Sequence, residues 1–280
     1  MDLSLITKVS PLNSDAFGLA AFAVLSLVLV ECAKTFRWRI FLGPGAPGLP
    51  HCLRALVAGQ LTNALLPLRA GDAVRIGMIV WSGSLLTVAT VSTAAAKAID
   101  ALCLAGIAAL IVGAEFAGLR WIPPVLAVCG LVAIIWVRRE PAIAQRLIDR
   151  VPLVRKLRIA ELAVVLASIG PRQIALALTM TVIVWTCGTM ANLAILAAAG
   201  IAPTFDLAVR MLVGVYLAGL APAPPARVVV FEGVVAGTLM TAGVDPGAAA
   251  LAGLLLHGAL LVELGALFLI ANASTWLRRR

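Results

Sequence analysis

Two short stretches of this apolar chain carry charged side chains just after proline-containing turns. The first holds Arg69, Asp72 and Arg75, and the second holds Arg227 and Glu232. Each acidic residue stands where a short helix is expected to begin. A helix N-terminus carries a partial positive charge and attracts anions, most strongly where water is excluded. We interpret the two stretches as halves of one polar site.

A regular spacing links each stretch to a later helix. Lys97 follows Asp72 by 25 residues, and His257 follows Glu232 by the same 25 residues. Equal spacing of this kind is expected when a chain contains two related units. The sequence therefore predicts that residues 51–113 superpose on residues 211–273, with Asp72 near Glu232 and Lys97 near His257.

Each of these residues also has a purely structural interpretation. Asp72 is placed to act as the N-cap of the helix that follows it. Lys97 and Asp100 are three residues apart, so they share a helix face and can form an internal ion pair. Alternatively, Asp72, Lys97 and Asp100 neutralise one another and leave Arg75 available for an anion. His257 is either a structural hydrogen-bonding group or a proton relay.

The cost of charge inside a membrane favours a polar cavity. An unpaired arginine such as Arg75 costs roughly 2.5–3.5 kcal/mol at the bilayer centre, so it is expected to pair or to line a path for water or substrate. Arg69 has the alternative of extending its charged end to the interface. Asn63 adds a neutral polar group, and Glu232 is expected across the cavity. The proposed substrate-binding residues are Asn63, Arg69, Asp72, Arg75, Lys97, Asp100, Arg227, Glu232 and His257.

Composition sets the fold class. The chain of 280 residues is 62% hydrophobic and 12% charged, whereas soluble domains are about 45–50% apolar and 25% charged. Several apolar runs approach the length of a membrane-spanning helix, and none alternates as a strand does. We therefore expect an all-α polytopic membrane protein. Its net charge of +9 is assigned to cytoplasmic loops and not to nucleic-acid binding.

No cofactor or metal site is expected, and no catalytic set stands out. The five cysteines have no metal-ligand spacing, and we interpret them as packing residues. The enzyme hypothesis is therefore the weaker one.

The expected architecture is a single transmembrane domain over residues 1–280. Two helix pairs, at residues 51–82 and 208–242, are too short to cross as separate spans and are predicted to be re-entrant hairpins lining a polar cavity. The basic segment 138–171 is expected to lie on anionic lipid headgroups as a cytoplasmic connector. It separates a first half, 16–113, from a second half, 172–280. Five full spans are expected at about residues 16–33, 85–113, 125–137, 173–199 and 248–271.

Basic residues predict the orientation. Fifteen lie on the side reached after the first span and three on the other side, so the first of these sides is cytoplasmic, the N-terminus is outside and the C-terminus is inside. The two hairpins then enter from opposite faces, as in inverted-repeat transporters. We interpret the residues that end the first span as a basic and aromatic interfacial anchor, formed by Lys34, Arg37, Trp38 and Arg39.

Four motifs resemble one known family. They are Arg37-Trp38-Arg39, the stretch from Asn63 to Arg75, Lys97-Ala-Ile-Asp100, and Pro224 to Gly233 with Phe231-Glu232. Together they are similar to the flippase-like family that includes the transmembrane region of lysylphosphatidylglycerol synthase. Members of that family usually carry glycines at Ala226-Arg227-Val228, arginine at the positions of Lys97 and His257, and one more N-terminal helix.

The resemblance implies a flippase-like transporter in the bacterial cytoplasmic membrane. Such a protein moves a lipid with a polar, phosphate-bearing headgroup between leaflets. The alternative is an integral-membrane enzyme, or an accessory subunit, in the synthesis of lipids or lipid-linked sugars. A third hypothesis is a scaffold on which lipid-biosynthesis enzymes assemble. The expected partners are a membrane lipid substrate and anionic headgroups at the cytoplasmic face.

Overall fold

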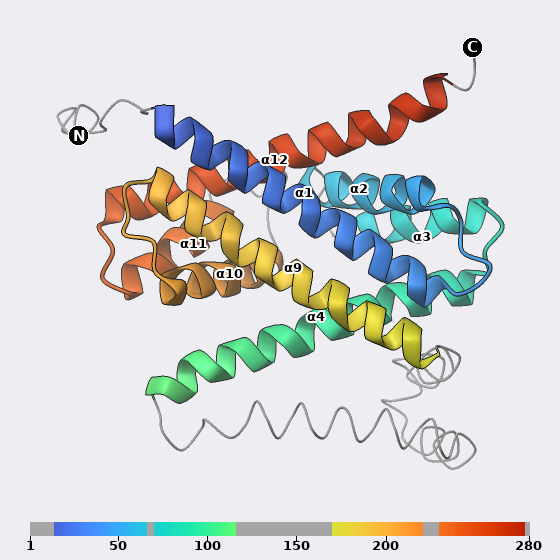
Figure 1. Ribbon diagram of the computed structural model, residues 1–280, viewed down its shortest axis with the longest axis horizontal. Helices are drawn as coiled ribbons and strands as arrows, with labels where there is room; N and C mark the ends of the chain where they lie inside the picture. The colour runs from blue at the N-terminus through green and yellow to red at the C-terminus, as the bar shows by residue number, and fades with distance from the viewer. Residues whose placement is uncertain (1–13, 66–69, 116–169, 221–229, 278–280) are drawn as a thin grey trace. The chain divides into compact units, whose positions relative to one another are not determined.

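A computed structural model describes residues 14–65, 70–115, 170–220 and 230–277. Within these ranges the chain forms eight α-helices and no strand (Figure 1). This agrees with the expected all-α class. The helices are α1 (Ser14–Leu42), α2 (Leu49–Leu65), α3 (Gly71–Trp81), α4 (Leu86–Glu115), α9 (Pro171–Ala198), α10 (Phe205–Leu220), α11 (Val230–Thr241) and α12 (Pro246–Leu277).

The predicted helices correspond closely to the observed ones wherever the two can be compared. The main difference is α1, which continues to Leu42 although the apolar run ends near residue 33. In these last turns Arg37 and Trp38 are buried and form hydrogen bonds with other helices. The predicted span 125–137, nearly all of the connector 138–171, and both proline turns lie outside the described residues.

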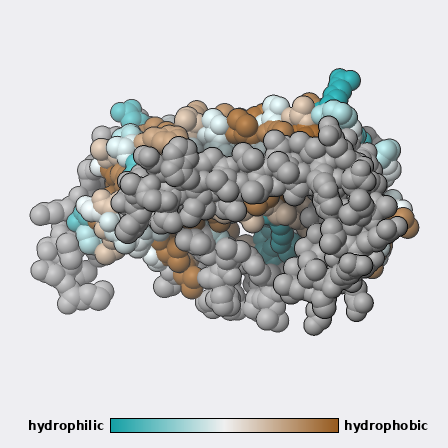
Figure 2. Space-filling model, turned by 90° about the horizontal axis from the view of Figure 1, so that it is seen from below, coloured by the Kyte–Doolittle hydropathy of each residue, from teal (hydrophilic) through white to brown (hydrophobic). Residues whose placement is uncertain are grey.

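Four of the described helices are long and apolar enough to cross a membrane. Large apolar side chains are exposed along them, including Phe17 at 80%, Val182 at 64% and Leu269 at 70% exposed. Figure 2 shows such apolar residues on the surface of the described chain. Exposed apolar surface of this extent is unusual for a protein in water but suits contact with lipid. The chain is therefore a multi-pass membrane protein.

The described helices belong to two compact units. The α2–α3 unit contains α2, α3, α4, α1 from Glu31, α9 up to Val184, and α12 from Leu267. The α10–α11 unit contains α10, α11, α1 up to Val30, α9 from Trp185, and α12 up to Ala266. Each predicted hairpin is thus a packed helix pair within one unit. Their entry from opposite faces stays a prediction.

Two glycines allow α2 and α3 to pack closely (Figure 1). A Cβ atom on Gly59 would lie 2.6 Å from the carbonyl oxygen of Gly71, and one on Gly71 would overlap the carbonyl oxygen of Gly59. Only glycine leaves room for backbones this close. The core of this unit includes the fully buried Trp38, Cys52 and Ile79.

In the α10–α11 unit, α10 and α11 pack together around an apolar core that contains Met211, Val235 and Leu239. The buried amide of Asn192 on α9 donates a hydrogen bond of 3.0 Å to the carbonyl of Ala208 on α10. This bond ties the hairpin to the long helix beside it. The same unit buries Glu263 of α12 at 1% exposure, a residue that the sequence analysis did not single out.

Both hairpins end in a turn of the same type. After α3, the Ser84 N–H donates to the Ile79 carbonyl, and Gly83 adopts a φ of 99°. After α11, the Val244 N–H donates to the Leu239 carbonyl, and Gly243 adopts a φ of 83°. Both are Schellman motifs, in which a glycine in the left-handed region ends the helix. Each turn leads directly into the long helix that carries Lys97 or His257.

Candidate functional site

The start of α3 is capped from the neighbouring helix. The Gly71 N–H donates a hydrogen bond of 2.8 Å to Oδ1 of Asn63 on α2. Ala70, the residue at the N-cap position, contributes no side-chain hydrogen bond. The capping interpretation of Asp72 is therefore wrong, because Asp72 lies inside the first turn and its side chain points elsewhere. Asn63 performs the capping role, from a position that only helix packing could reveal.

Asp72 instead forms an ion pair with Lys97 on α4. The predicted ion pair between Lys97 and Asp100 within α4 is also wrong, because each of them pairs with a residue of another helix. The Asp72–Lys97 pair is accessible, with side chains that are 34% and 50% exposed. A pair this accessible can exchange partners with a ligand at little desolvation cost.

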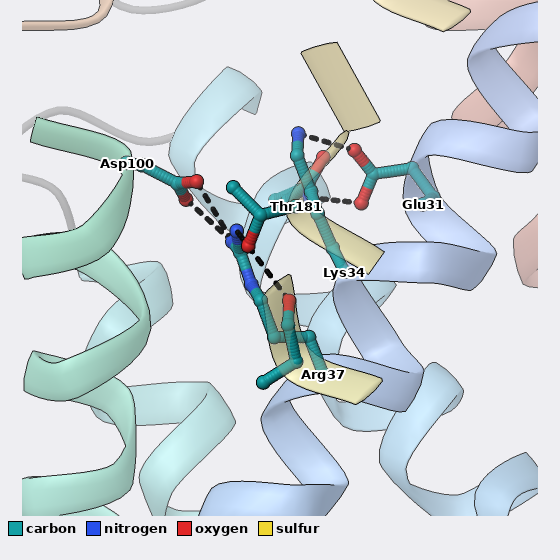
Figure 3. Close-up of polar contacts among 7 residues, drawn as sticks. Glu31, Lys34, Arg37, Asp100 and Thr181 are labelled. Atoms are coloured by element: carbon teal, nitrogen blue, oxygen red, sulfur yellow. Dashed lines mark hydrogen bonds and ion pairs between the residues drawn. The ribbon is translucent and has the colours of Figure 1, made fainter. Parts of the chain in front are cut away.

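Asp100 on α4 forms an ion pair with a buried arginine of α1. Nη2 of Arg37 donates to both carboxylate oxygens of Asp100, at 2.8 and 2.9 Å, and Nη1 donates to Oγ1 of Thr181 on α9 at 3.1 Å (Figure 3). Arg37 is 1% exposed, and Trp38 beside it is fully buried. The indole N–H of Trp38 donates to Ser92. The expectation that Arg37 and Trp38 anchor the chain at the interface is therefore wrong.

A second buried carboxylate lies one and a half turns earlier on α1. Glu31 is 4% exposed and accepts a hydrogen bond of 2.8 Å from Lys34 (Figure 3). It also accepts one from the amide of Gln60 on α2. The sequence analysis did not single out Glu31. The signal was present, since Glu31 is the one acidic residue within the first apolar run, and charges at such positions usually have a function.

Arg75 on α3 has no carboxylate of the described residues in hydrogen-bond contact with its Nε and Nη2 atoms. Its guanidinium carbon stands 3.7 Å from the centroid of the Trp38 ring. Its Nε and Nη2 atoms are buried and have no hydrogen-bond partner among the described residues. The cation–π contact with Trp38 holds the side chain in place. These two charge-assisted donors therefore have no acceptor among the described residues.

The charges of this group do not cancel. Among the described residues named above, four cations stand beside three carboxylates, so these seven side chains carry an excess of one positive charge. The cations are Lys34, Arg37, Arg75 and Lys97, and the carboxylates are Glu31, Asp72 and Asp100.

The α10–α11 unit contains its own pair. Nδ1 of His257 on α12 lies 2.7 Å from Oε1 of Glu232, the third residue of α11. Both side chains are 13% exposed, and the ring of Phe231 lies against the imidazole at a centroid distance of 5.0 Å. His257 is therefore a partner of Glu232 and is not isolated on an apolar helix.

The two pairs share the spacing seen in the sequence. In each, the acidic residue near the start of the short helix contacts the residue 25 positions later, on the following long helix. Each hairpin thus contacts its long helix in the same way. Arg69 and Arg227, also predicted to line the site, lie outside the described residues.

Among the described residues, no three histidine, cysteine or carboxylate side chains gather in a way that could hold a metal ion. Cys52 and Cys187 are free thiols.

Comparison with protein families gives one match. Residues 4–267 match the family described as the lysylphosphatidylglycerol synthase TM region. The chain belongs to this family. Neither the curated proteins nor the solved structures gave a match. Membership in the lysylphosphatidylglycerol synthase TM region family agrees with the resemblance carried by the sequence motifs, and it relates the chain to membrane proteins of lipid modification and transport.

Proposed function

We propose that this protein is a flippase-like transporter, which moves a lipid with a phosphate-bearing headgroup across the cytoplasmic membrane. The observation that carries the proposal is Arg75. Its two buried donors lack partners among the described residues, and they belong to a group with an excess positive charge. A lipid phosphate offers the oxygen acceptors and the negative charge that such a guanidinium binds.

The first turn of α3 supports the same function. Asp72 lies in this turn and Arg75 directly follows it, near the end of the helix where the dipole favours an anion. Lys97 reaches the turn from α4 and is half exposed. In this mechanism the phosphate binds Arg75 and competes with Asp72 for Lys97, while the acyl chains remain in the lipid.

Reconstitution tests the proposal. The purified protein is placed in liposomes that contain fluorescent phosphatidylglycerol, and transbilayer movement is followed by chemical quenching of the outer leaflet. Replacing Arg75 with Gln removes charge-assisted hydrogen bonds worth about 1.5–3 kcal/mol, so we expect transport to slow about tenfold or more. Arg39→Gln is the matched control, because Arg39 is exposed and donates to the Pro47 carbonyl outside this group.

A second variant tests the ion pair. Asp72→Asn removes an exposed pairing partner of Lys97, so the stability should fall by at most about 1 kcal/mol. Transport should nevertheless change, because Lys97 is no longer neutralised. Asp206→Asn is the control, since it removes the exposed Asp206–Arg210 pair on α10.

The same liposomes separate the alternatives. Chromatography of the extracted lipids detects any chemical conversion, which would favour the enzyme hypothesis. Absence of both movement and conversion, or normal transport by Arg75→Gln, would contradict the proposed function.

A further inference from the structure

Trp38 and Ser92 form a buried hydrogen-bonded pair between α1 and α4. Both side chains are fully buried, and the indole N–H of Trp38 donates a hydrogen bond of 3.2 Å to Oγ of Ser92. The Ser92 hydroxyl in turn donates to the carbonyl of Ala89, at 3.1 Å. A buried indole N–H needs an acceptor, so this bond fixes how the Trp38 ring lies against α4.

The face of the same ring holds Arg75. The guanidinium carbon stands 3.7 Å from the ring centroid, and a guanidinium at this distance is attracted to the face of an indole. One edge of the ring is therefore tied to α4, while its face carries a side chain of α3. The position of the Arg75 guanidinium thus depends on the hydrogen bond between Trp38 and Ser92.

The two unpartnered atoms of Arg75 lie on one edge of the guanidinium. Nε and Nη2 are buried, and neither has a hydrogen-bond partner among the described residues. Because Nη2 is the terminal nitrogen trans to Cδ, one of its N–H groups points in the same direction as the Nε–H. Two parallel donors of this kind match two oxygens bound to one phosphorus or one carbon. A lysine in the same place would supply the charge without this edge.

We propose that Arg75 binds a single oxyanion through both hydrogen bonds of this edge, and that Trp38 and Ser92 are positioning residues that hold the guanidinium for it. The nature of the oxyanion, the phosphate of a lipid headgroup, rests on the transport function proposed above. An arginine that is already held in its binding position loses less conformational entropy when the anion arrives. Ser92 acts through the Trp38 ring.

Fluorine NMR tests the binding mode without transport. The protein is labelled with 5-fluorotryptophan, and Trp38→Phe identifies the Trp38 signal among those of the six tryptophans. We expect dihexanoyl phosphatidylglycerol to move this signal, because the phosphate binds the guanidinium that lies on the ring. Arg75→Lys should need about tenfold more lipid, although the charge is kept. A Trp38 signal that does not move, or equal affinity in Arg75→Lys, would overturn the two-bond mode.

Inorganic phosphate separates the two sources of such an oxyanion. A response of the Trp38 signal to the lipid, at concentrations where inorganic phosphate gives none, supports a lipid headgroup as the ligand. A response to inorganic phosphate alone would leave the two-bond site standing and overturn the lipid substrate.

The role of Ser92 is tested in the liposome assay. Ser92→Ala leaves the indole N–H without its acceptor, so we expect transport to slow about fivefold. The matched control is Thr93→Val, because Thr93 is also buried on α4 and its hydroxyl donates to the same Ala89 carbonyl. Equal transport rates for Ser92→Ala and Thr93→Val would contradict the positioning role.

A double variant shows whether Ser92 acts through Trp38. In a Trp38→Phe background the indole N–H is absent, so adding Ser92→Ala should cause no further slowing. If the two substitutions slow transport independently, Ser92 has some other role and the proposal is wrong. If the wild type moves no lipid, the proposed function fails. The NMR titration then still decides the positioning role, since Ser92→Ala should bind the lipid more weakly than Thr93→Val.

Discussion

Among single residues, Arg37 shows most directly how burial redirects a basic side chain. A guanidinium near the end of an apolar helix can reach the lipid interface, but Arg37 is held inside by Asp100 and Thr181. A buried arginine with a two-oxygen contact is geometrically well defined. Its role is to fix α1 against α4 and α9 next to Arg75.

Removing this arginine should destabilise the protein. Arg37→Gln leaves the carboxylate of Asp100 without its buried partner, so we expect a loss of about 3 kcal/mol. Thermal unfolding in detergent, followed by circular dichroism, measures the effect against Arg39→Gln. Adding Asp100→Asn to Arg37→Gln should restore part of the loss, because the unpaired charge is then gone. An Arg37→Gln protein as stable as the Arg39→Gln control would contradict this role.

At the level of helices, the close approach of α2 and α3 positions the candidate site. Gly59 and Gly71 bring the two backbones together, and this contact places Asn63 on the first N–H of α3. Asp72 lies in the first turn of α3, and Arg75 directly follows that turn. The geometry of the site therefore depends on two residues that have no side chain.

A pair of glycine variants tests this dependence. Gly71→Ala places a methyl group against the Gly59 backbone, so we expect a loss of about 2 kcal/mol from overpacking. Gly77→Ala lies on the same helix with open space around it, so it should stabilise the helix by up to about 1 kcal/mol. Equal melting temperatures for the two variants would show that the close approach does not matter.

At the level of the whole molecule, the distribution of basic residues predicts the orientation in the membrane. Fifteen basic residues on one side against three on the other predict that the C-terminus and the basic connector are cytoplasmic and that the N-terminus is outside. The two hairpins then enter from opposite faces, as expected for an inverted repeat.

Cysteine labelling tests this orientation. In a background with the native cysteines replaced by serine, we expect a membrane-impermeant thiol reagent added outside to label Ser4→Cys. It should label Gln145→Cys and Arg280→Cys only after the membrane is opened. Labelling of residues 145 and 280 from opposite sides would refute the predicted topology.

Much of the architecture followed from the sequence alone. Long apolar runs predicted the helices that can span a membrane, and shorter apolar runs predicted the helix pairs α2–α3 and α10–α11. Both predictions were possible because hydrophobic length is a local property of the chain. Each 25-residue spacing joins two residues that contact each other, Asp72 with Lys97 and Glu232 with His257, whereas the superposition of the two units stays a prediction. The motifs indicated the family because each motif is a continuous stretch of the sequence.

The choice of partners was decided only by the tertiary structure. Asp72, Lys97 and Asp100 had several acceptable arrangements in sequence, and helix packing selected pairs between helices over the internal pair and the N-cap. Lys97 lies close to Asp100 in the sequence, yet the partner of Asp100 is Arg37 on α1, 63 residues away along the chain. Coulomb attraction depends on distance in space, and the cost of a buried charge depends on every neighbour, so neither can be read from spacing along the chain.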